Sequence, residues 1–251
     1  MYTNERLQEI MNIVRKQGFS TVKYLSNALH ISPSSIRRDL TFLEQRGLVS
    51  RSYGGVELCE FVSKNISFSL RTQEKLNEKK RITAEAAKLV KDGYVVFTDA
   101  SSTCFLLLKE LLSARDITVI TNSVDGLALV SDYNIKVIST GGIISSENRS
   151  ALVGSWTEKF FMNSYADIAF FSTQAIDENG SIYDCSLAEI AAREQMLAHS
   201  KQKVYLAEGS KICQKSSFIQ CTLSDVDTVI SDIDLSDIYK KNFSDTDFIT
   251  A

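Results

Sequence analysis

The sequence is poor in the residues that mark secreted and metal-binding proteins. In 251 residues it has one proline, two histidines and five cysteines. The cysteines form no CxxC pair and are odd in number, which argues against a disulfide framework and favours a reducing, cytoplasmic setting. Two histidines without paired ligand spacing argue against a zinc site, so we expect neither a metal nor a cofactor.

Long apolar runs and nucleotide-binding fingerprints are also missing. No stretch approaches the roughly 20 apolar residues that a membrane-spanning helix needs, and the polar start of the chain does not resemble a secretory signal. We therefore expect no membrane partner. The sequence contains no GxGxxG or P-loop motif, which leaves its glycine pairs as candidates for turns first and for ligand contacts second.

What the sequence does have is an uneven distribution of charge. The net charge is −3, yet residues 1–58 carry eight lysines and arginines against five acidic residues, and the rest of the chain carries 20 against 26. A basic N-terminal segment on an acidic body suggests contact with nucleic acid at one end.

Two amphipathic helices are expected within the first thirty residues. An apolar stripe at i, i+3, i+4 and i+7 defines the first, and it consists of Leu7, Ile10, Met11 and Val14. Gly18 suits a left-handed cap at the end of this helix. Ser20 or Thr21 can cap the start of the second helix.

A third helix is expected to begin at Ser32, with Pro33 in its first turn, where the missing N–H costs nothing. Its inner stripe consists of Ile36, Leu40 and Leu43. The opposite face carries small hydroxyls and arginines near the helix start. Arginine can contact guanine bidentately, and hydroxyls at a helix N-terminus can hold phosphates, so this face suits the DNA major groove.

After Gly47, two short strands joined at Tyr53-Gly54-Gly55 are expected to form a hairpin. Three helices and a hairpin make a winged helix-turn-helix domain, which we place at residues 1–58. The candidate DNA-binding residues are Thr21, Ser32, Ser34, Ser35, Arg37, Arg38, Thr41, Arg51, Tyr53 and Gly54. The alternative is a three-helix satellite domain whose arginines are merely solvated.

The rest of the chain predicts an α/β domain. A polar segment, residues 59–77, is expected to be a linker, and a helix is expected over about 78–91. Within the domain at 78–251, buried strands such as YVVFTDA and DIAFFST alternate with helices, which indicates a mainly parallel sheet.

Ligands bind such sheets beyond the carboxyl ends of the strands. There the sequence places hydroxyls, amides, glycines, carboxylates and one ammonium. The candidate effector-binding residues are Asp99, Ser101, Ser102, Thr103, Thr121, Asn122, Ser123, Gly141, Gly142, Glu189, Glu208 and Lys211. The segment 101–103 opens a helix and can cradle a phosphate, to which Lys211 can add a point charge. The alternatives are an ordinary helix cap, a simple glycine turn and a solvated lysine.

Taken together, these motifs resemble the DeoR family of bacterial transcriptional regulators. The resemblance is most specific in ISPSSIRRDLTFLEQRGLVSRSYGGV, and it continues through FTDASST, VITNS, STGG and AEGSK. It implies a winged helix-turn-helix domain followed by a sensor domain similar in fold to ribose-5-phosphate isomerase and coenzyme A transferases. It also implies a repressor of carbohydrate-metabolism genes, dimeric or tetrameric, that binds an operator in double-stranded DNA and is controlled by a phosphorylated sugar or related metabolite.

The chain departs from the family pattern at a few positions. Ser101 stands where the phosphate loop commonly has glycine, Tyr53 replaces a histidine of the wing, and Glu208 replaces an aspartate. The loop 172–177 lacks its usual glycine. Two alternatives remain open beside the non-enzymatic regulator. One is a phosphosugar isomerase that uses Glu189, Glu208 and Lys211, and the other is a regulator controlled by a protein partner.

Overall fold

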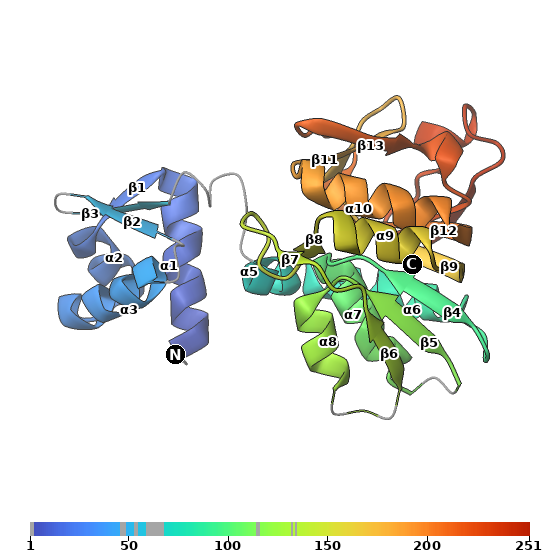
Figure 1. The fold of residues 1–251 in the computed structure, drawn as a ribbon. Coiled ribbons are helices and arrows are strands. Elements are labelled where there is room, and N and C mark those ends of the chain that lie inside the picture. Colours follow the sequence, from blue (N-terminus) through green and yellow to red (C-terminus); the bar gives the residue numbers. More distant parts are fainter. Residues whose placement is uncertain are drawn as a thin grey trace. The chain divides into compact units, whose positions relative to one another are not determined.

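The structure is a computed structural model. It describes residues 3–45, 49–52, 55–58, 68–113, 116–131, 133 and 135–251. The chain forms two compact units, Met1–Arg71 and Thr72–Ala251 (Figure 1). No helix within the described ranges is both long enough and apolar enough to cross a membrane.

Within the described residues, the first unit contains three helices and a small antiparallel sheet. In chain order these elements are α1 (Thr3–Gln17), β1 (Phe19–Thr21), α2 (Val22–Leu29), α3 (Pro33–Gln45), β2 (Val49–Ser52) and β3 (Gly55–Leu58). A further helix, α5 (Phe68–Gln73), includes residues on both sides of the boundary between the units. The strand order is β1-β3-β2. This is the winged helix-turn-helix arrangement that the sequence predicts.

The expected helix boundaries of this unit have clear physical causes. Gly18 follows α1 with a φ of +74°, and its N–H bonds to the carbonyl of Val14. Thr21 caps α2, since its Oγ1 accepts a hydrogen bond from Tyr24 N. Strand β1 was not predicted. Its three residues are extended because they pair with β3, and three residues are too short for a pattern to reveal.

Within the described residues, the second unit is built on a sheet of seven parallel strands. They are β4 (Val95–Thr98), β5 (Thr118–Thr121), β6 (Lys136–Ser139), β9 (Ala166–Phe171), β12 (Ser200–Ala207), β14 (Thr228–Ser231) and β15 (Asp247–Thr250). Their order is β15-β14-β12-β9-β4-β5-β6, and each pairing is parallel. The order of the strands reverses between β4 and β9, so the sheet has its topological switch point there.

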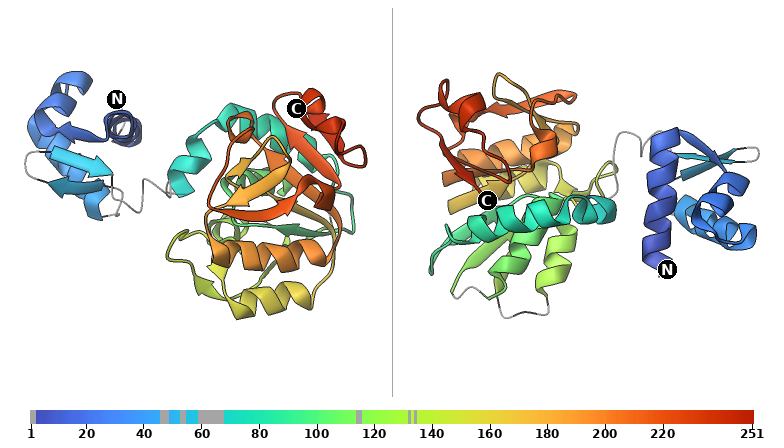
Figure 2. Two further views of the ribbon diagram at one scale, coloured as in Figure 1. Left: turned by 90° about the horizontal axis from the view of Figure 1, so that it is seen from above. Right: turned by 180° about the vertical axis from the view of Figure 1, so that it is seen from behind.

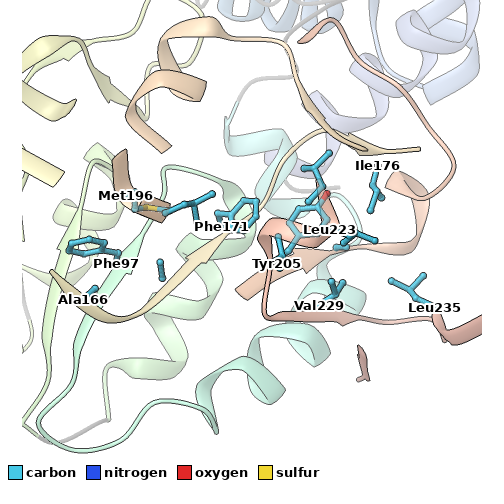
Figure 3. Close-up of a cluster of buried hydrophobic side chains, with 14 of the residues drawn as sticks. Phe97, Ala166, Phe171, Ile176, Met196, Tyr205, Leu223, Val229 and Leu235 are labelled. Carbon is cyan, nitrogen blue, oxygen red and sulfur yellow. The ribbon is translucent and has the colours of Figure 1, made fainter. Parts of the chain in front are cut away.

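Helices cover both faces of this sheet (Figures 1 and 2). They are α6 (Leu76–Ala87), α7 (Ser102–Leu111), α8 (Val124–Val130), α9 (Ser155–Met162) and α10 (Leu187–Ala198). One core contains Ile82 of α6, Leu107 of α7 and Val96 of β4. The core on the other face contains Phe161 of α9, Met196 of α10 and Phe97 of β4. Figure 3 labels Met196 and Phe97 within this core. Adjacent strand residues therefore enter opposite cores, as expected for a doubly covered sheet.

Several parts of this unit differ from the sequence-based expectation. The helix expected over 78–91 runs from Leu76 to Ala87, and α5 lies within the segment expected to be a linker. Short strands not predicted form a hairpin, β7 (Ile143–Ile144) with β8 (Leu152–Val153), and a separate sheet of β10 (Ala175–Ile176), β11 (Ser181–Asp184) and β13 (Phe218–Thr222). Strands β7, β8 and β10 have two residues each, too few to show a periodicity, so only their pairing reveals them.

Candidate functional site

The recognition helix α3 presents its predicted face to solvent. Ile36, Leu40 and Leu43 are buried, whereas Arg37 and Arg38 are exposed. Ser32 caps the helix, because its Oγ accepts a hydrogen bond from Ser35 N at 3.3 Å. Ser34 and Thr41 are exposed on the same helix. The structure thus separates a packed stripe from a surface of arginines and hydroxyls.

Strand β2 of the wing lies against this helix. Arg51 Nη1 donates a hydrogen bond to Thr41 Oγ1 at 3.3 Å, and it lies 3.9 Å from a carboxylate oxygen of Glu44. Arg51 is therefore held beside the exposed face of α3. The predicted wing residues Tyr53 and Gly54 lie outside the described residues.

In the second unit, Asp99 and Ser101, two of the predicted effector residues, lie at the switch point between β4 and β9. Asp99 follows β4 directly. Its Oδ1 accepts a hydrogen bond from Ser101 N at 3.0 Å, and its Oδ2 accepts one from Ser172 N at 3.2 Å. One carboxylate thus ties the loop before α7 to the residue that follows β9. This is the edge at which open α/β sheets bind ligands.

The loop before α7 does not need the glycine that the family pattern has. Ser101 has a φ of −76°, an ordinary extended conformation, and its hydroxyl accepts a hydrogen bond from Cys104 N. It is an N-cap that leaves the first turn of α7 intact. Burial, followed by the nearby Asp99 carboxylate, raises the pKa of the Cys104 thiol, so Cys104 stays protonated beneath this loop.

Two lysines hydrogen-bond to the loops that Asp99 joins. Lys79 of α6 is buried, and its Nζ donates a hydrogen bond to Ser102 Oγ at 3.3 Å. Lys211 Nζ donates to Ser172 Oγ at 2.7 Å. The Lys79 ammonium therefore lies at the N-terminus of α7, which itself carries a partial positive charge, and the Lys211 ammonium lies at the residue that follows β9. The arrangement suits an anion.

A buried arginine, Arg193, hydrogen-bonds to the Asp99 carboxylate of this loop. Arg193 of α10 donates to Asp99 Oδ2 at 3.1 Å, to Asp184 Oδ2 at 2.9 Å and to Gln220 Oε1 at 2.7 Å. Burial alone would lower the pKa of Arg193, but the carboxylates of Asp184, Asp99 and Glu189 raise it. The guanidinium therefore stays charged and holds Asp99 in place.

The residues after β5 form a neighbouring group. Thr121 Oγ1 donates to Thr98 O, and Ser123 caps α8 by accepting from Gly126 N. Asn122 Nδ2 donates to Leu152 O at 2.9 Å. Within the described part of the chain, Asn122 Oδ1 and Thr103 Oγ1 are buried without a hydrogen-bond partner. Such atoms are costly unless a ligand or water satisfies them.

Gly141 and Gly142 lie elsewhere along this edge and contact α9. Thr157 Oγ1 donates to Gly141 O at 2.7 Å. In the described residues no hydrogen bond joins this turn to the Asp99 loop. Their assignment to the effector site therefore stays a prediction.

The remaining carboxylates hold protein groups. Glu189 Oε2 accepts a hydrogen bond from Asn148 Nδ2 at 2.9 Å, and Glu208 accepts hydrogen bonds from Ser210 N and Ser210 Oγ. Glu189 therefore joins two chain segments, whereas Glu208 caps the short 3₁₀ helix Gly209–Lys211. Among the described residues, no cluster of His, Cys, Asp and Glu could hold a metal ion.

Sequence reasoning missed Lys79, Ser172 and Arg193. The helical periodicity of the apolar residues could have revealed Lys79 and Arg193. Lys79 precedes the buried Ile82 and Ala86 by three and seven positions, and Arg193 lies three positions from the buried Ile190 and Met196. A charged residue on an apolar stripe is unusual and marks a paired or functional group. No pattern marks Ser172.

Comparison with known proteins gives matches to two family models. The DeoR-like helix-turn-helix domain matches residues 6–62, and the DeoR C-terminal sensor domain matches residues 74–233. The HTH-type transcriptional regulator GolR of Listeria innocua is 31% identical over 246 residues, which cover 98% of this chain and 96% of that protein.

Of two further relatives, one is named an activator and the other a repressor. The L-fucose operon activator of Haemophilus influenzae is 31% identical and covers 99% of both chains. The HTH-type transcriptional repressor GlcR of Bacillus subtilis is 32% identical and covers 92% of this chain and 89% of its own. Among solved structures, ribose 5-phosphate isomerase A of Methanocaldococcus jannaschii is 21% identical over 53% of each chain, with a TM-score of 0.41.

Proposed function

This chain belongs to the DeoR family of helix-turn-helix transcriptional regulators, and from that premise we propose that it represses carbohydrate-metabolism genes under the control of a phosphorylated sugar or related metabolite. The repressor GlcR and the glycerol-3-phosphate regulon repressor of Haemophilus influenzae are among its relatives. Their names support both the repressor role and the phosphorylated effector.

One observation carries the effector proposal: Lys79 and Lys211 hydrogen-bond to the two loops that the Asp99 carboxylate joins, one before α7 and one after β9. Lys79 bonds to Ser102 and Lys211 to Ser172, while Asp99 joins the two loops. A phosphate at this position gains two point charges, the helix dipole and the hydroxyls of the loop. A neutral sugar gains only the hydroxyls.

The same site favours binding over catalysis. An isomerase needs a carboxylate positioned at the reacting carbon. Glu189 and Glu208, the acid–base candidates of that hypothesis, accept hydrogen bonds from Asn148 and Ser210 instead. These bonds support a sensor without enzymatic activity.

For the DNA-binding unit, we propose that Arg37 and Arg38 contact base edges and that Ser34 and Ser35 contact phosphates. Arg51 extends this surface from the wing. We further propose that the protein acts in the cytoplasm as a homodimer or homotetramer. Two copies can then bind half-sites about 34–36 Å apart, or at multiples of that spacing.

The test is capture of genomic DNA fragments on the purified protein, followed by release with a panel of phosphosugars and the matching unphosphorylated sugars. We expect a discrete set of fragments that one phosphosugar releases and its unphosphorylated form does not. Fragments that no sugar moves would overturn the effector proposal and favour control by a protein partner. Tighter retention by the phosphosugar would replace the repressor role with one in which the effector promotes DNA binding.

A further inference from the structure

One ion pair joins the recognition helix α3 to α1. Arg6 Nε donates to Asp39 Oδ2 at 2.6 Å, and Arg6 Nη2 donates to Asp39 Oδ1 at 2.8 Å. Asp39 is 4% exposed and directly follows Arg37 and Arg38 in the sequence. Neither Arg6 nor Asp39 belongs to the exposed face of α3 that we assign to DNA.

The core contacts of α3 with the rest of its unit are apolar, and at the exposed surface Arg51 adds a hydrogen bond to Thr41 and a 3.9 Å contact with Glu44. The core of the unit consists of aliphatic side chains and methionine, and it includes Ile10, Leu25 and Leu40. Apolar contacts have no preferred direction, so they tolerate small rotations of one helix against another. A bidentate arginine–carboxylate pair is planar and directional, and it fixes the rotation of α3 about its own axis.

That rotation decides where the recognition arginines point. Successive side chains on an α-helix are about 100° apart, because the helix has about 3.6 residues per turn. With Asp39 held inward, Arg38 and Arg37 are directed outward, as their exposure shows. A helix released from Arg6 can rotate and move both guanidinium groups away from the base edges.

We propose that Arg6 is a positioning residue that sets the discrimination between operator and other DNA. Bidentate contacts to a base need precise geometry, whereas contacts to phosphates depend mainly on charge. Loss of the fork therefore weakens binding to the operator and leaves binding to random DNA almost unchanged. If the pair only stabilised the fold, its loss would lower the unfolding temperature without changing the ratio of the two affinities.

The test compares Arg6→Lys with the wild-type full chain. Lysine keeps the positive charge and removes the fork. The probes are a fragment that the wild-type protein retains in the genomic capture and a shuffled duplex of the same length and composition, both at one salt concentration. We expect about tenfold weaker binding to the retained fragment, which is similar to the loss of affinity caused by one mismatched base pair. For the shuffled duplex we expect a change of less than about twofold. Arg81→Lys, which alters an exposed arginine of the second unit, is the matched control.

Asp39→Asn is a second variant, for which a simple charge effect and the positioning proposal predict opposite changes in affinity for the retained fragment. It removes a negative charge from the DNA-binding unit, so charge alone would tighten binding to all DNA. Positioning requires weaker binding to the retained fragment. Circular dichroism at the assay temperature verifies that each variant is folded. An unchanged affinity ratio for Arg6→Lys, or tighter fragment binding by Asp39→Asn, would overturn the proposal.

Discussion

At the scale of single residues, charged side chains on apolar stripes organise this protein. Lys79, Arg193 and Asp39 are each at most 4% exposed. Each lies at a helix position that pattern reasoning would assign to the core, and each makes a hydrogen bond to another element. Burying a charge is costly unless it is paired, so each of these residues depends on its hydrogen-bond partner.

Lys79→Met is expected to abolish most of the response to the phosphorylated effector. Methionine keeps the length of the side chain and removes the ammonium beside Ser102. The affinity for the phosphosugar that releases DNA should fall at least about tenfold, since a charged hydrogen bond contributes about 1.5–3 kcal/mol. Titration calorimetry measures it.

Lys80→Met is the matched control for this variant, because Lys80 is the exposed neighbour on the same helix. Its effector affinity should stay at the wild-type value. Equal effects of the two substitutions would remove Lys79 from the site.

Asp177 should make folding stability depend on acid pH. Burial alone would raise its pKa, but hydrogen bonds from Ser181 N, Tyr183 Oη and Asn179 N, together with Lys215, lower the pKa below its usual 3.8. A lowered pKa in the folded state adds stability above the unfolded pKa, and this stability is lost as the pH falls through the folded pKa.

Asp177→Asn should therefore destabilise the protein by about 1–2 kcal/mol at neutral pH. The difference from wild type should start to shrink below about pH 4, where the carboxyl group of the unfolded chain takes up a proton, and it should be smallest below the lowered pKa of the folded state. Urea unfolding at pH 7 and pH 3 measures both values. The exposed neighbour Glu178 provides the control substitution to Gln. A pH-independent difference would assign the effect to shape instead of charge.

At the scale of elements, the turn after β6 depends on one glycine more than on its neighbour. Gly142 has a φ of +121°, and a Cβ there would lie 2.2 Å from Thr157 Oγ1 and 2.8 Å from Val153 O. Gly141 has a φ of +65° and open space around it. The two positions therefore differ in steric room although both favour glycine.

Gly142→Ala should destabilise the protein by about 1–3 kcal/mol, because strain and collision act together. Gly141→Ala should cost about 1 kcal/mol, since it adds only the left-handed conformation. Thermal unfolding of the two variants makes the comparison. Equal losses would show that α9 moves freely to accept the new methyl group.

The strands show which elements a sequence can reveal. The apolar runs of β4 and β9 enter two cores and stand out as buried strands, and both predictions are confirmed. Strand β14, with the sequence TVIS, is equally buried, yet it is not among the predicted strands. The short strands β7 and β10 are extended because they pair with β8 and β11, respectively.

At the scale of the whole molecule, the two compact units imply two separable ligand responses. We expect the phosphosugar that releases DNA to raise the unfolding temperature of Thr72–Ala251, and the captured DNA fragment to raise that of Met1–Arg71. At a free concentration 100 times the Kd, a ligand stabilises its unit by about 2.7 kcal/mol. Scanning calorimetry with each ligand alone measures these shifts.

Two transitions, each moved by one ligand, would agree with this expectation. A single transition moved equally by either ligand would contradict it, because the units would then unfold together. Lys79→Met serves as a control, since its sensor transition should no longer respond to the phosphosugar while the response to DNA remains.

By itself, the sequence determined what local chemistry can decide. Helix caps, the apolar stripes of α1 and α3, the arginine pair and the alternation of buried strands with helices each depend on residues close together in the chain. The tertiary structure alone decided the partners of the charges. Arg6 and Asp39 are 33 positions apart, and Arg193 and Asp99 are 94 apart. Hydrogen bonds at such separations leave no periodic signal, because folding brings their ends together only through the packing of other elements.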